Sequence, residues 1–149
     1  MNVLGRPLLV VRLRGTVNVR DPVEKTLKLL HLTKRYRATM IPDTPSFRGM
    51  LKVIQNQVAW CEVDSPLVEE LIRKRGRTRR LGKDQGVDVG EMAVSISAGR
   101  KRLEDHGLKP TFALSPPRGG FKASSRRLYS QGGVLGKNSE LPELVRKML

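Results

Sequence analysis

The sequence predicts an α+β fold, in which a β-α-β-α-β core precedes a basic C-terminal extension. Three short segments with the residue pattern of strands are separated by two segments with the apolar spacing of helices. The density of basic residues then rises after a third helical segment. Helices packed on one face of a small three-stranded sheet would bury the apolar sides of the core elements. We therefore expect a core over residues 1–64 and an extension over residues 65–149.

The three expected strands are short and rich in strand-favouring residues. The first, Pro7–Arg14, places leucine and valine on one face and Arg12 and Arg14 on the other. The second and third are expected over Tyr36–Ile41 and Val58–Val63. A core of this size is close to the smallest that folds unaided, roughly 60 residues.

Each core helix opens with a capping residue followed by proline, a combination typical of helix starts. Asp21 is the expected N-cap of the first helix, where it precedes Pro22 and forms a capping box with Glu24. Thr44 and Pro45 open the second helix in the same way. The apolar residues that follow at helical spacing are Val23, Leu27 and Leu30, and then Phe47, Met50, Leu51 and Ile54.

The extension is expected to contain three helices. The first, over residues 65–75, opens at Ser65 and directs Leu67, Val68, Leu71 and Ile72 inward. The second covers residues 88–105 approximately and opens with a capping box formed by Asp88 and Glu91. The third covers residues 140–149 approximately. A terminal helix this short is unstable alone, so it should dock on another part of the chain.

A basic, glycine-rich loop is expected over Ser115–Lys137. No Asp or Glu occurs between Asp105 and Glu140, and two glycine pairs interrupt the segment. Such a composition buries too little apolar surface to offset the entropy that ordering removes. The residues alone leave two interpretations open, a disordered cationic linker or a loop that an anionic partner orders. Helical segments on both sides would make it a loop held at its two ends.

The net charge of +15 indicates an anionic partner. Nucleic acid is the leading candidate, and an anionic membrane surface is a weaker one. Aromatic residues make up only 4% of the chain, which favours phosphate and shape contacts over platforms for several stacked bases. The longest apolar run, Leu8–Val11, is too short for a membrane span or a signal core, so we expect a cytosolic protein.

Basic side chains and the glycines beside them are the candidate RNA-binding residues. Arginine offers phosphate a planar set of donors, and glycine lets the backbone come close. For each of them, the structural alternative is a solvated basic surface. Residues 73–83 form the densest run, with seven cations and no anion. The candidates are Arg12, Arg14, Gly15, Lys34, Arg35, Arg48, Gly49, Lys52, Arg73, Arg75, Arg77, Arg79, Arg80, Lys83, Arg118, Gly119, Gly120, Lys122, Arg126, Arg127 and Lys137.

Other kinds of site find little support in the sequence. His31 and His106 have no partner ligands at metal-binding spacing, and Cys61 is most simply a core thiol. We expect no cofactor and no catalytic residue, since no nucleotide-binding loop or nucleophile motif occurs. Residues 12–19, RLRGTVNV, are weakly similar to the phosphate loop of acylphosphatase-type enzymes, but the glycine pattern is incomplete. A free RNA chaperone or assembly factor would have the same charge and core.

Several motifs, in order along the chain, resemble one family. They are RLRG at 12–15, TLKLLHL at 26–32, DTPSFRGM at 43–50, LVEELIRKRG at 67–76, SPPRGGFK at 115–122, QGGVLGK at 131–137 and ELVRKM at 143–148. The chain is thereby similar to the large-subunit ribosomal protein family numbered thirty. The extension fits the long archaeal form, which is related to the eukaryotic proteins numbered seven.

The resemblance implies a ferredoxin-like core and a structural role without catalysis or cofactor. It further implies that the protein binds and stabilises 23S ribosomal RNA near the 5S RNA, takes part in subunit assembly and contacts neighbouring large-subunit proteins. The expected location is therefore the large ribosomal subunit in the cytoplasm. An RNA chaperone and, less favoured, an acylphosphatase-like enzyme are the alternatives.

Overall fold

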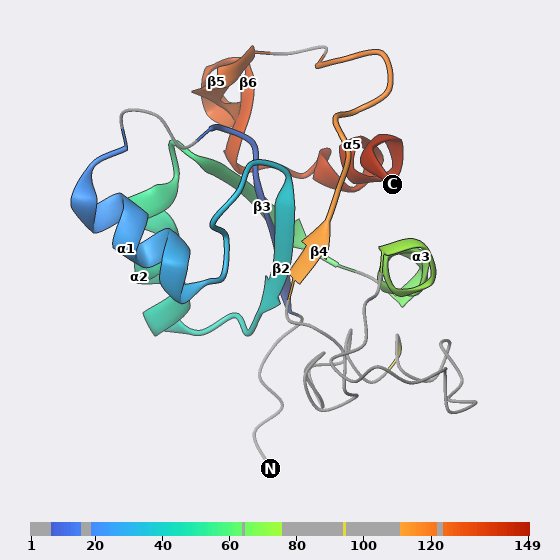
Figure 1. Ribbon diagram of the computed structural model, residues 1–149, viewed down its shortest axis with the longest axis horizontal. Coiled ribbons are helices and arrows are strands. Elements are labelled where there is room, and N and C mark those ends of the chain that lie inside the picture. Colours follow the sequence, from blue (N-terminus) through green and yellow to red (C-terminus); the bar gives the residue numbers. More distant parts are fainter. Residues whose placement is uncertain (1–6, 16–18, 64, 76–93, 95–110, 122–123) are drawn as a thin grey trace.

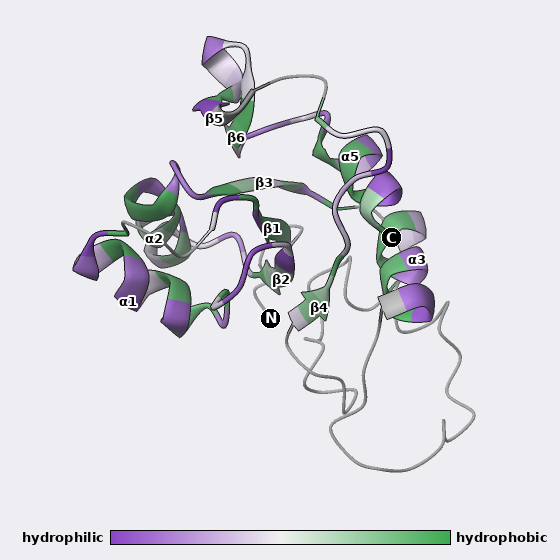
Figure 2. Ribbon diagram, turned by 45° about the horizontal axis from the view of Figure 1, so that its top comes forward, coloured by the Kyte–Doolittle hydropathy of each residue, from purple (hydrophilic) through white to green (hydrophobic). Residues whose placement is uncertain are grey.

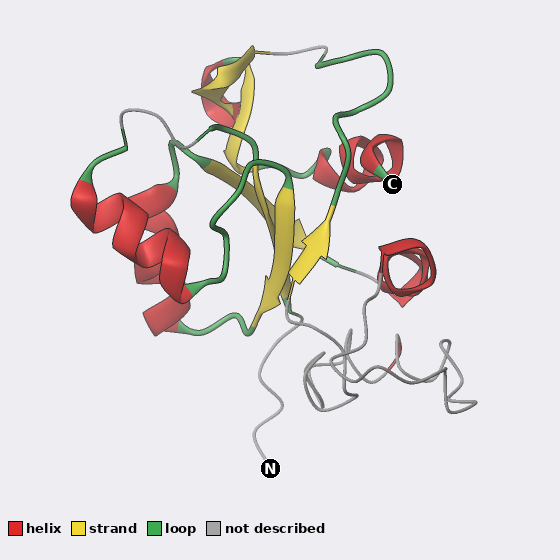
Figure 3. Cartoon of the chain, in the orientation of Figure 1, coloured by secondary structure: helices red, strands yellow, loops and turns green. Residues whose placement is uncertain are grey.

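A six-stranded sheet lies at the centre of the molecule, with helices on both of its faces (Figure 1). The computed structural model describes residues 7–15, 19–63, 65–75, 94, 111–121 and 124–149. The strand order is β4 (Thr111–Ala113), β2 (Arg37–Ile41), β1 (Leu8–Arg12), β3 (Val58–Glu62), β6 (Gly133–Lys137) and β5 (Ser124–Leu128). Figure 3 shows α1 and α2 on one side of the sheet and the remaining two long helices on the other. The predicted α+β, ferredoxin-like class is confirmed, with more strands than expected.

The described elements alternate between strands and helices over the first half of the chain. In order, they are β1 (Leu8–Arg12), α1 (Asp21–Leu29), β2 (Arg37–Ile41), α2 (Pro45–Ile54), β3 (Val58–Glu62), α3 (Ser65–Arg75), β4 (Thr111–Ala113), β5 (Ser124–Leu128), the 3-10 helix η2 (Tyr129–Gln131), β6 (Gly133–Lys137) and α5 (Leu141–Met148).

The three predicted core strands form the middle of the sheet. Strand β1 lies between β2 and β3 and is antiparallel to both. All five of its residues are buried, because both faces of the sheet are covered. Leu8 and Val10 join the apolar cluster under α1 and α2, whereas Leu9 and Val11 join the cluster on the opposite face. A strand covered on both faces is apolar at consecutive positions, which explains the run of four apolar residues.

The sheet has six strands where the sequence predicted three, and the additional strands come from the extension. β4 pairs with β2 at one edge, while β6 pairs with β3 and β5 pairs with β6 at the other. The prediction of a loop over residues 115–137 is therefore wrong in its second half, which holds β5, η2 and β6. Val134 and Leu135 are buried in the core, and this burial supplies the apolar contact that the overall composition had seemed to lack.

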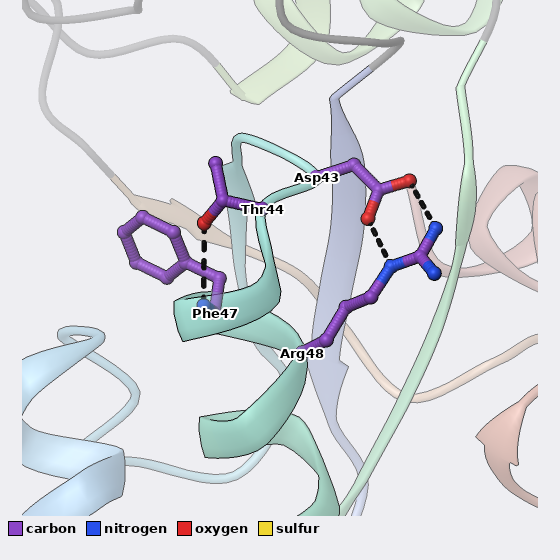
Figure 4. Close-up of polar contacts among 4 residues, drawn as sticks. All are labelled: Asp43, Thr44, Phe47 and Arg48. Carbon is purple, nitrogen blue, oxygen red and sulfur yellow. Dashed lines mark hydrogen bonds and ion pairs between the residues drawn. The ribbon is translucent and has the colours of Figure 1, made fainter.

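The start of α2 follows its prediction, whereas α1 begins differently. Thr44 caps α2, because its Oγ1 accepts a hydrogen bond from the Phe47 N–H at 3.3 Å (Figure 4). For α1, the N-cap is Arg20 and no side chain caps the helix, so the prediction of Asp21 as the N-cap is wrong. Asp21 is instead the first helical residue, where its carboxylate still interacts favourably with the helix dipole.

The second face of the sheet is covered by α3 and α5. The four inward residues predicted for α3 are all buried, and Leu141, Val145 and Met148 of α5 join the same cluster. Both helices are apolar toward the sheet and hydrophilic on the outside (Figure 2). The predicted helices at 65–75 and 140–149 are confirmed, while the one expected near 88–105 lies outside the described residues. No helix in the described part of the chain is long and apolar enough to cross a membrane.

Candidate nucleic-acid interface

Arg12 lies in the interior of the protein and not on a binding surface. Its side chain is 2% exposed, and its guanidinium donates to the carbonyl oxygens of Leu32 at 2.7 Å, Arg14 at 3.1 Å and Gly15 at 3.2 Å. Burial lowers the pKa of this guanidinium, and the Glu24 carboxylate acts in the opposite direction. Arg12 is therefore no part of the candidate interface, since it is buried and its donors already serve backbone carbonyls, that of buried Leu32 among them.

The outer side of α2 carries three of the candidates, Arg48, Gly49 and Lys52, which we call the α2 strip. All three residues are exposed. Arg48 and Lys52 are four residues apart and so lie one above the other on the helix. Apart from its chain neighbours and the backbone of α2 itself, nothing lies within 4 Å of the position that a Cβ on Gly49 would take, so the strip has an open gap at that point.

Arg48 is held in place by the carboxylate of Asp43, which lies just before α2 (Figure 4). Its Nε donates to Asp43 Oδ1 and its Nη2 donates to Oδ2 at 2.7 Å. Of the five guanidinium donors, this fork uses two and fixes the plane of the group. The Arg48 side chain remains 65% exposed, whereas that of Asp43 is 13% exposed. The Asp43 carboxylate thus fixes the orientation of the Arg48 guanidinium, while most of the Arg48 side chain remains accessible to solvent.

Asp43 interacts electrostatically with cations at the start of α2 and at the end of β6. The hydrogen bond from Arg48 lowers the pKa of Asp43, burial opposes this, and the charges of Arg48 and Lys137 add to the lowering. Lys137 pairs in register with Trp60 of β3. Because Trp60 packs on the cluster under α1 and α2, Lys137 belongs to the same face of the sheet as the α2 strip.

Three further candidates lie where β1 ends and β2 begins, and we call Arg14, Lys34 and Arg35 the sheet-end cluster. Lys34 and Arg35 are exposed, and Arg14 is partly exposed. Arg35 Nε donates to Leu13 O at 3.0 Å, and the Arg35 guanidinium carbon lies 4.8 Å from the centre of the Tyr36 ring. These contacts fix the direction of the Arg35 side chain.

The sheet-end cluster is joined to the α2 strip through one residue. Arg14 Nη1 lies 3.4 Å from the carbonyl oxygen of Asn56, to which it donates, and Asn56 follows the end of α2. The positions Arg48, Lys52 and Asn56 repeat at intervals of four residues along α2 and just beyond it. The structure therefore places the two basic groups side by side.

The Arg118 turn, Pro117–Gly120, is a second basic feature at a distance from α2. Gly120 N donates to Pro117 O at 3.1 Å, and Gly119 and Gly120 have φ values of +77° and +74°. Only glycine adopts this backbone readily, so both positions favour it strongly. Arg118 N donates to Lys147 O at 3.1 Å, which ties the turn to the end of α5. Arg118 itself is exposed.

The remaining candidates are distributed over several elements. Arg73 on α3 is exposed but pairs with Glu69 at 2.6 Å, and α3 lies across the sheet from α2. Arg127 on β5 is exposed. Arg75 belongs to α3 and Arg126 to β5, but the structure does not describe their side chains. Five candidates lie wholly outside the described residues, namely Arg77, Arg79, Arg80, Lys83 and Lys122.

Two exposed cations of α5 are not among the candidates that the sequence predicted. Arg146 and Lys147 are exposed in the last turn of α5, beside the turn that donates to Lys147 O. Cations in the last turn of a helix are stabilised by the helix dipole, so the sequence pattern could be explained without RNA binding. The docking of residues 115–118 on α5 brings Lys147 next to Arg118, whereas Arg146 Nε lies 3.9 Å from Glu70 Oε1 of α3.

The described residues offer no arrangement for metal chemistry. Within them, no group of three or more His, Cys, Asp or Glu side chains is placed to hold a metal ion. Cys61 is 6% exposed and belongs to the apolar core, as expected of a core thiol. His31 is exposed at the end of α1.

Comparison with known proteins gives one consistent result. The family model described as ribosomal protein L30p/L7e matches residues 8–58. The chain is 44% identical over 150 residues to the large ribosomal subunit protein uL30 of Cenarchaeum symbiosum, which covers 95% of this chain and 97% of that protein. It is 39% identical over 155 residues to the uL30 protein of Nitrosopumilus maritimus, and the match covers 98% of this chain and 100% of that protein. For the uL30 protein of Aeropyrum pernix, the identity is 40% over 154 residues, covering 94% and 97%.

Proposed function

The chain belongs to the ribosomal protein L30p/L7e family, and on this premise we propose that it is a structural component of the large ribosomal subunit that binds ribosomal RNA. The family consists of ribosomal structural proteins and not of enzymes, so the acylphosphatase-type alternative has no support. A structural RNA-binding role also gives the net charge of +15 a purpose, because phosphates neutralise it.

The observation that supports RNA binding best is that the α2 strip and the sheet-end cluster lie side by side. Arg48 is fixed by Asp43, and Arg14 and Arg35 are fixed by backbone carbonyls, so three guanidinium groups are held in place before any RNA binds. Pre-oriented donors lose less side-chain entropy on binding than mobile ones. The two groups together therefore contact the phosphates of one RNA segment and position the protein on it.

The Arg118 turn is a second anchor in this proposal. Its backbone is fixed against α5, and Lys147 adds positive charge beside it. Two anchors on different elements can hold two RNA segments in a defined relation, which is what a structural protein of a ribonucleoprotein particle must do. Arg73, Arg75, Arg77, Arg79, Arg80, Lys83, Lys122, Arg126, Arg127 and Lys137 stay proposed phosphate contacts.

The RNA partner in this proposal is 23S ribosomal RNA near the 5S RNA, with neighbouring large-subunit proteins as protein partners. Membership of the L30p/L7e family supports this assignment. It places the protein in the cytoplasm, in the large subunit, and gives it a part in subunit assembly.

Sedimentation of a cell extract tests the structural role. The protein should co-migrate with the large subunit and remain there after a high-salt wash, because contacts over a broad surface survive partial screening. Recovery only in the light fractions after that wash would instead favour a free RNA chaperone or assembly factor.

A matched pair of double variants tests the α2 strip. Binding to an in vitro transcript of archaeal large-subunit ribosomal RNA should weaken for R48Q/K52Q, and the slope of log affinity against log salt should fall by about one to two. The control K25Q/K28Q removes two exposed cations from α1, outside the strip, and should change affinity far less. Equal losses for both pairs would indicate general charge attraction and no defined interface.

A further inference from the structure

We propose that a pocket at the ends of β3 and β6 binds a single unstacked nucleotide of the RNA. The pocket has a volume of about 470 Å³. Its lining residues are Cys61, Glu62, Tyr129, Lys137, Asn138 and Ser139. Small-ligand pockets usually measure about 300–1,000 Å³, so this one is large enough for a nucleotide. The proposal deepens the proposed function and rests on it.

The pocket exists because β6 leaves the sheet early. β6 pairs with β3 as far as Trp60 and Lys137, and Asn138 N then donates to Trp60 O at 3.0 Å. The chain turns there toward α5, while β3 continues to Glu62. The last residues of β3 thus form one wall of the pocket. The other wall consists of Tyr129 of η2 and of Asn138 and Ser139, which lie between β6 and α5.

Asn138 fixes the shape of the pocket. Its side chain is buried, with Nδ2 donating to Val134 O at 3.1 Å and Oδ1 accepting from Glu140 N at 2.9 Å. Leu141 N donates to the Asn138 carbonyl at 3.2 Å. A turn held by these bonds does not need to be ordered by the ligand, so binding costs less conformational entropy than it would in a mobile loop.

The lining offers the three kinds of contact that an extruded nucleotide uses. Tyr129 provides an aromatic ring on which a base can stack, and its hydroxyl lies 3.5 Å from Ser139 Oγ. Lys137 is exposed and supplies a cation for the phosphate. Glu62 is exposed and can accept a hydrogen bond from a base amino group, as carboxylates do with cytosine.

The Tyr129 side chain is accessible to solvent. At 36% exposure, it is the one aromatic residue among the exposed large apolar side chains in the described ranges. A low aromatic content argues against a platform for several bases, but one ring in a preformed pocket suffices for one nucleotide.

The position of Lys137 favours an RNA nucleotide over an unrelated small molecule. Lys137 lies on the α2 side of the sheet and its charge reaches Asp43, the carboxylate that holds Arg48. An RNA segment following the α2 strip therefore passes the mouth of the pocket, where a nucleotide that is not base-paired can enter.

The test compares two short RNA hairpins of the same stem, one of which carries a single bulged 2-aminopurine. The full chain should bind the bulged hairpin about tenfold more tightly than the plain one, as expected for one stacked base. The fluorescence of 2-aminopurine should change on binding, because the base leaves the RNA stack and meets the tyrosine.

Two variants at one position separate the ring from the hydroxyl. Y129L should abolish the preference for the bulge and leave the affinity for the plain hairpin unchanged, whereas Y129F should retain the preference. Thermal melting of both variants checks that the fold is intact, and Y129F keeps the ring contact where Y129L removes it.

Three outcomes are distinguishable. Equal affinity of the native chain for both hairpins, or equal loss for both in Y129L, would overturn the nucleotide pocket and leave the α2 strip standing. A bulge preference that survives Y129L would also overturn it. Absence of any salt-dependent binding to either hairpin or to ribosomal RNA would contradict the proposed function itself.

Discussion

The two faces of the sheet are built in different ways. One face is covered by α1 and α2, which alternate with the strands they cover within residues 8–62. The other is covered by α3 and α5, which are separated from each other by residues 76–140 of the chain. The first face could be assembled from local patterns, whereas the second depends on contacts between distant residues. The extension is therefore part of the folded core and not an appendage.

The largest expected effect concerns this shared core. L71A, on α3, should lower the free energy of unfolding by about 2–5 kcal/mol, as should L27A on α1, because each empties a fully buried site. Urea unfolding should be followed by far-UV circular dichroism and by the fluorescence of Trp60, the only tryptophan, which packs on the first face.

The position of Trp60 makes this measurement decisive. If both faces unfold as one unit, L71A shifts the Trp60 transition as far as the circular dichroism transition. Two separate transitions in L71A would show that the second face unfolds alone and that the two faces do not form one cooperative core. L29A, at a side chain that is 70% exposed, is the control and should change stability little.

The next effect separates two arginines that are two residues apart. R12M should cost about 1–3 kcal/mol in unfolding free energy, because the buried Leu32 carbonyl and its neighbours lose their donor. R14M should cost much less stability but should weaken RNA binding, since Arg14 is on the surface beside Asn56.

Chemical denaturation and RNA affinity, measured on both variants, check this division. A stable R12M protein with reduced RNA affinity would reverse our assignment of Arg12 to the interior.

A smaller gain is expected at the end of α1. His31 has a φ of +61°, and Leu32 N donates to Leu27 O at 2.8 Å while His31 N donates to Lys28 O at 3.0 Å. This is the helix-ending motif in which glycine is preferred. H31G should therefore stabilise the protein by about 0.5–1 kcal/mol, the relief of left-handed strain less the added entropy of the unfolded chain.

The matched control for this prediction is H31A, which keeps a Cβ in the strained backbone and should give no gain. Thermal unfolding of the three proteins measures the order. If H31A were as stable as H31G, the gain would come from loss of the imidazole and not from relief of backbone strain.

The smallest effect is the pH dependence of the Asp43–Arg48 pair. The folded pKa of Asp43 lies below its unfolded value of about 3.9, so the pair stabilises the protein above that pH and loses its effect as pH falls through the folded pKa. D43N should be less stable than the native chain near pH 6, and the difference should vanish in strong acid. Melting temperatures across this range test the sign, and a difference that grows on acidification would contradict it.

The sequence predicted the elements whose signals are local. Thr44 and Pro45 marked the start of α2, and the inward residues of α3 followed from their spacing. Asp21 was misplaced by one position, because a carboxylate before proline suits both the cap and the first turn. Arg12 was assigned to the surface, because alternation along a strand cannot tell whether one face or both faces of the sheet will be covered.

The strands of the extension were missed for a related reason. Gly133 is buried, and a Cβ there would collide with the backbone of Arg127, so this glycine is a packing requirement and not a sign of a loop. The pocket beside Tyr129 was equally hidden, since Glu62 and Lys137 are far apart in sequence and meet only through the pairing of β3 with β6.

Local residue patterns and composition were enough to predict the fold class, the helices with strong caps or regular spacing, the excess of positive charge and the family resemblance. These properties depend on neighbouring residues or on composition. The tertiary structure alone decided which cations face solvent, which edges β4, β5 and β6 occupy, and how the α2 strip meets the sheet-end cluster. Such features depend on which distant segments pack together, and no local spacing records that choice.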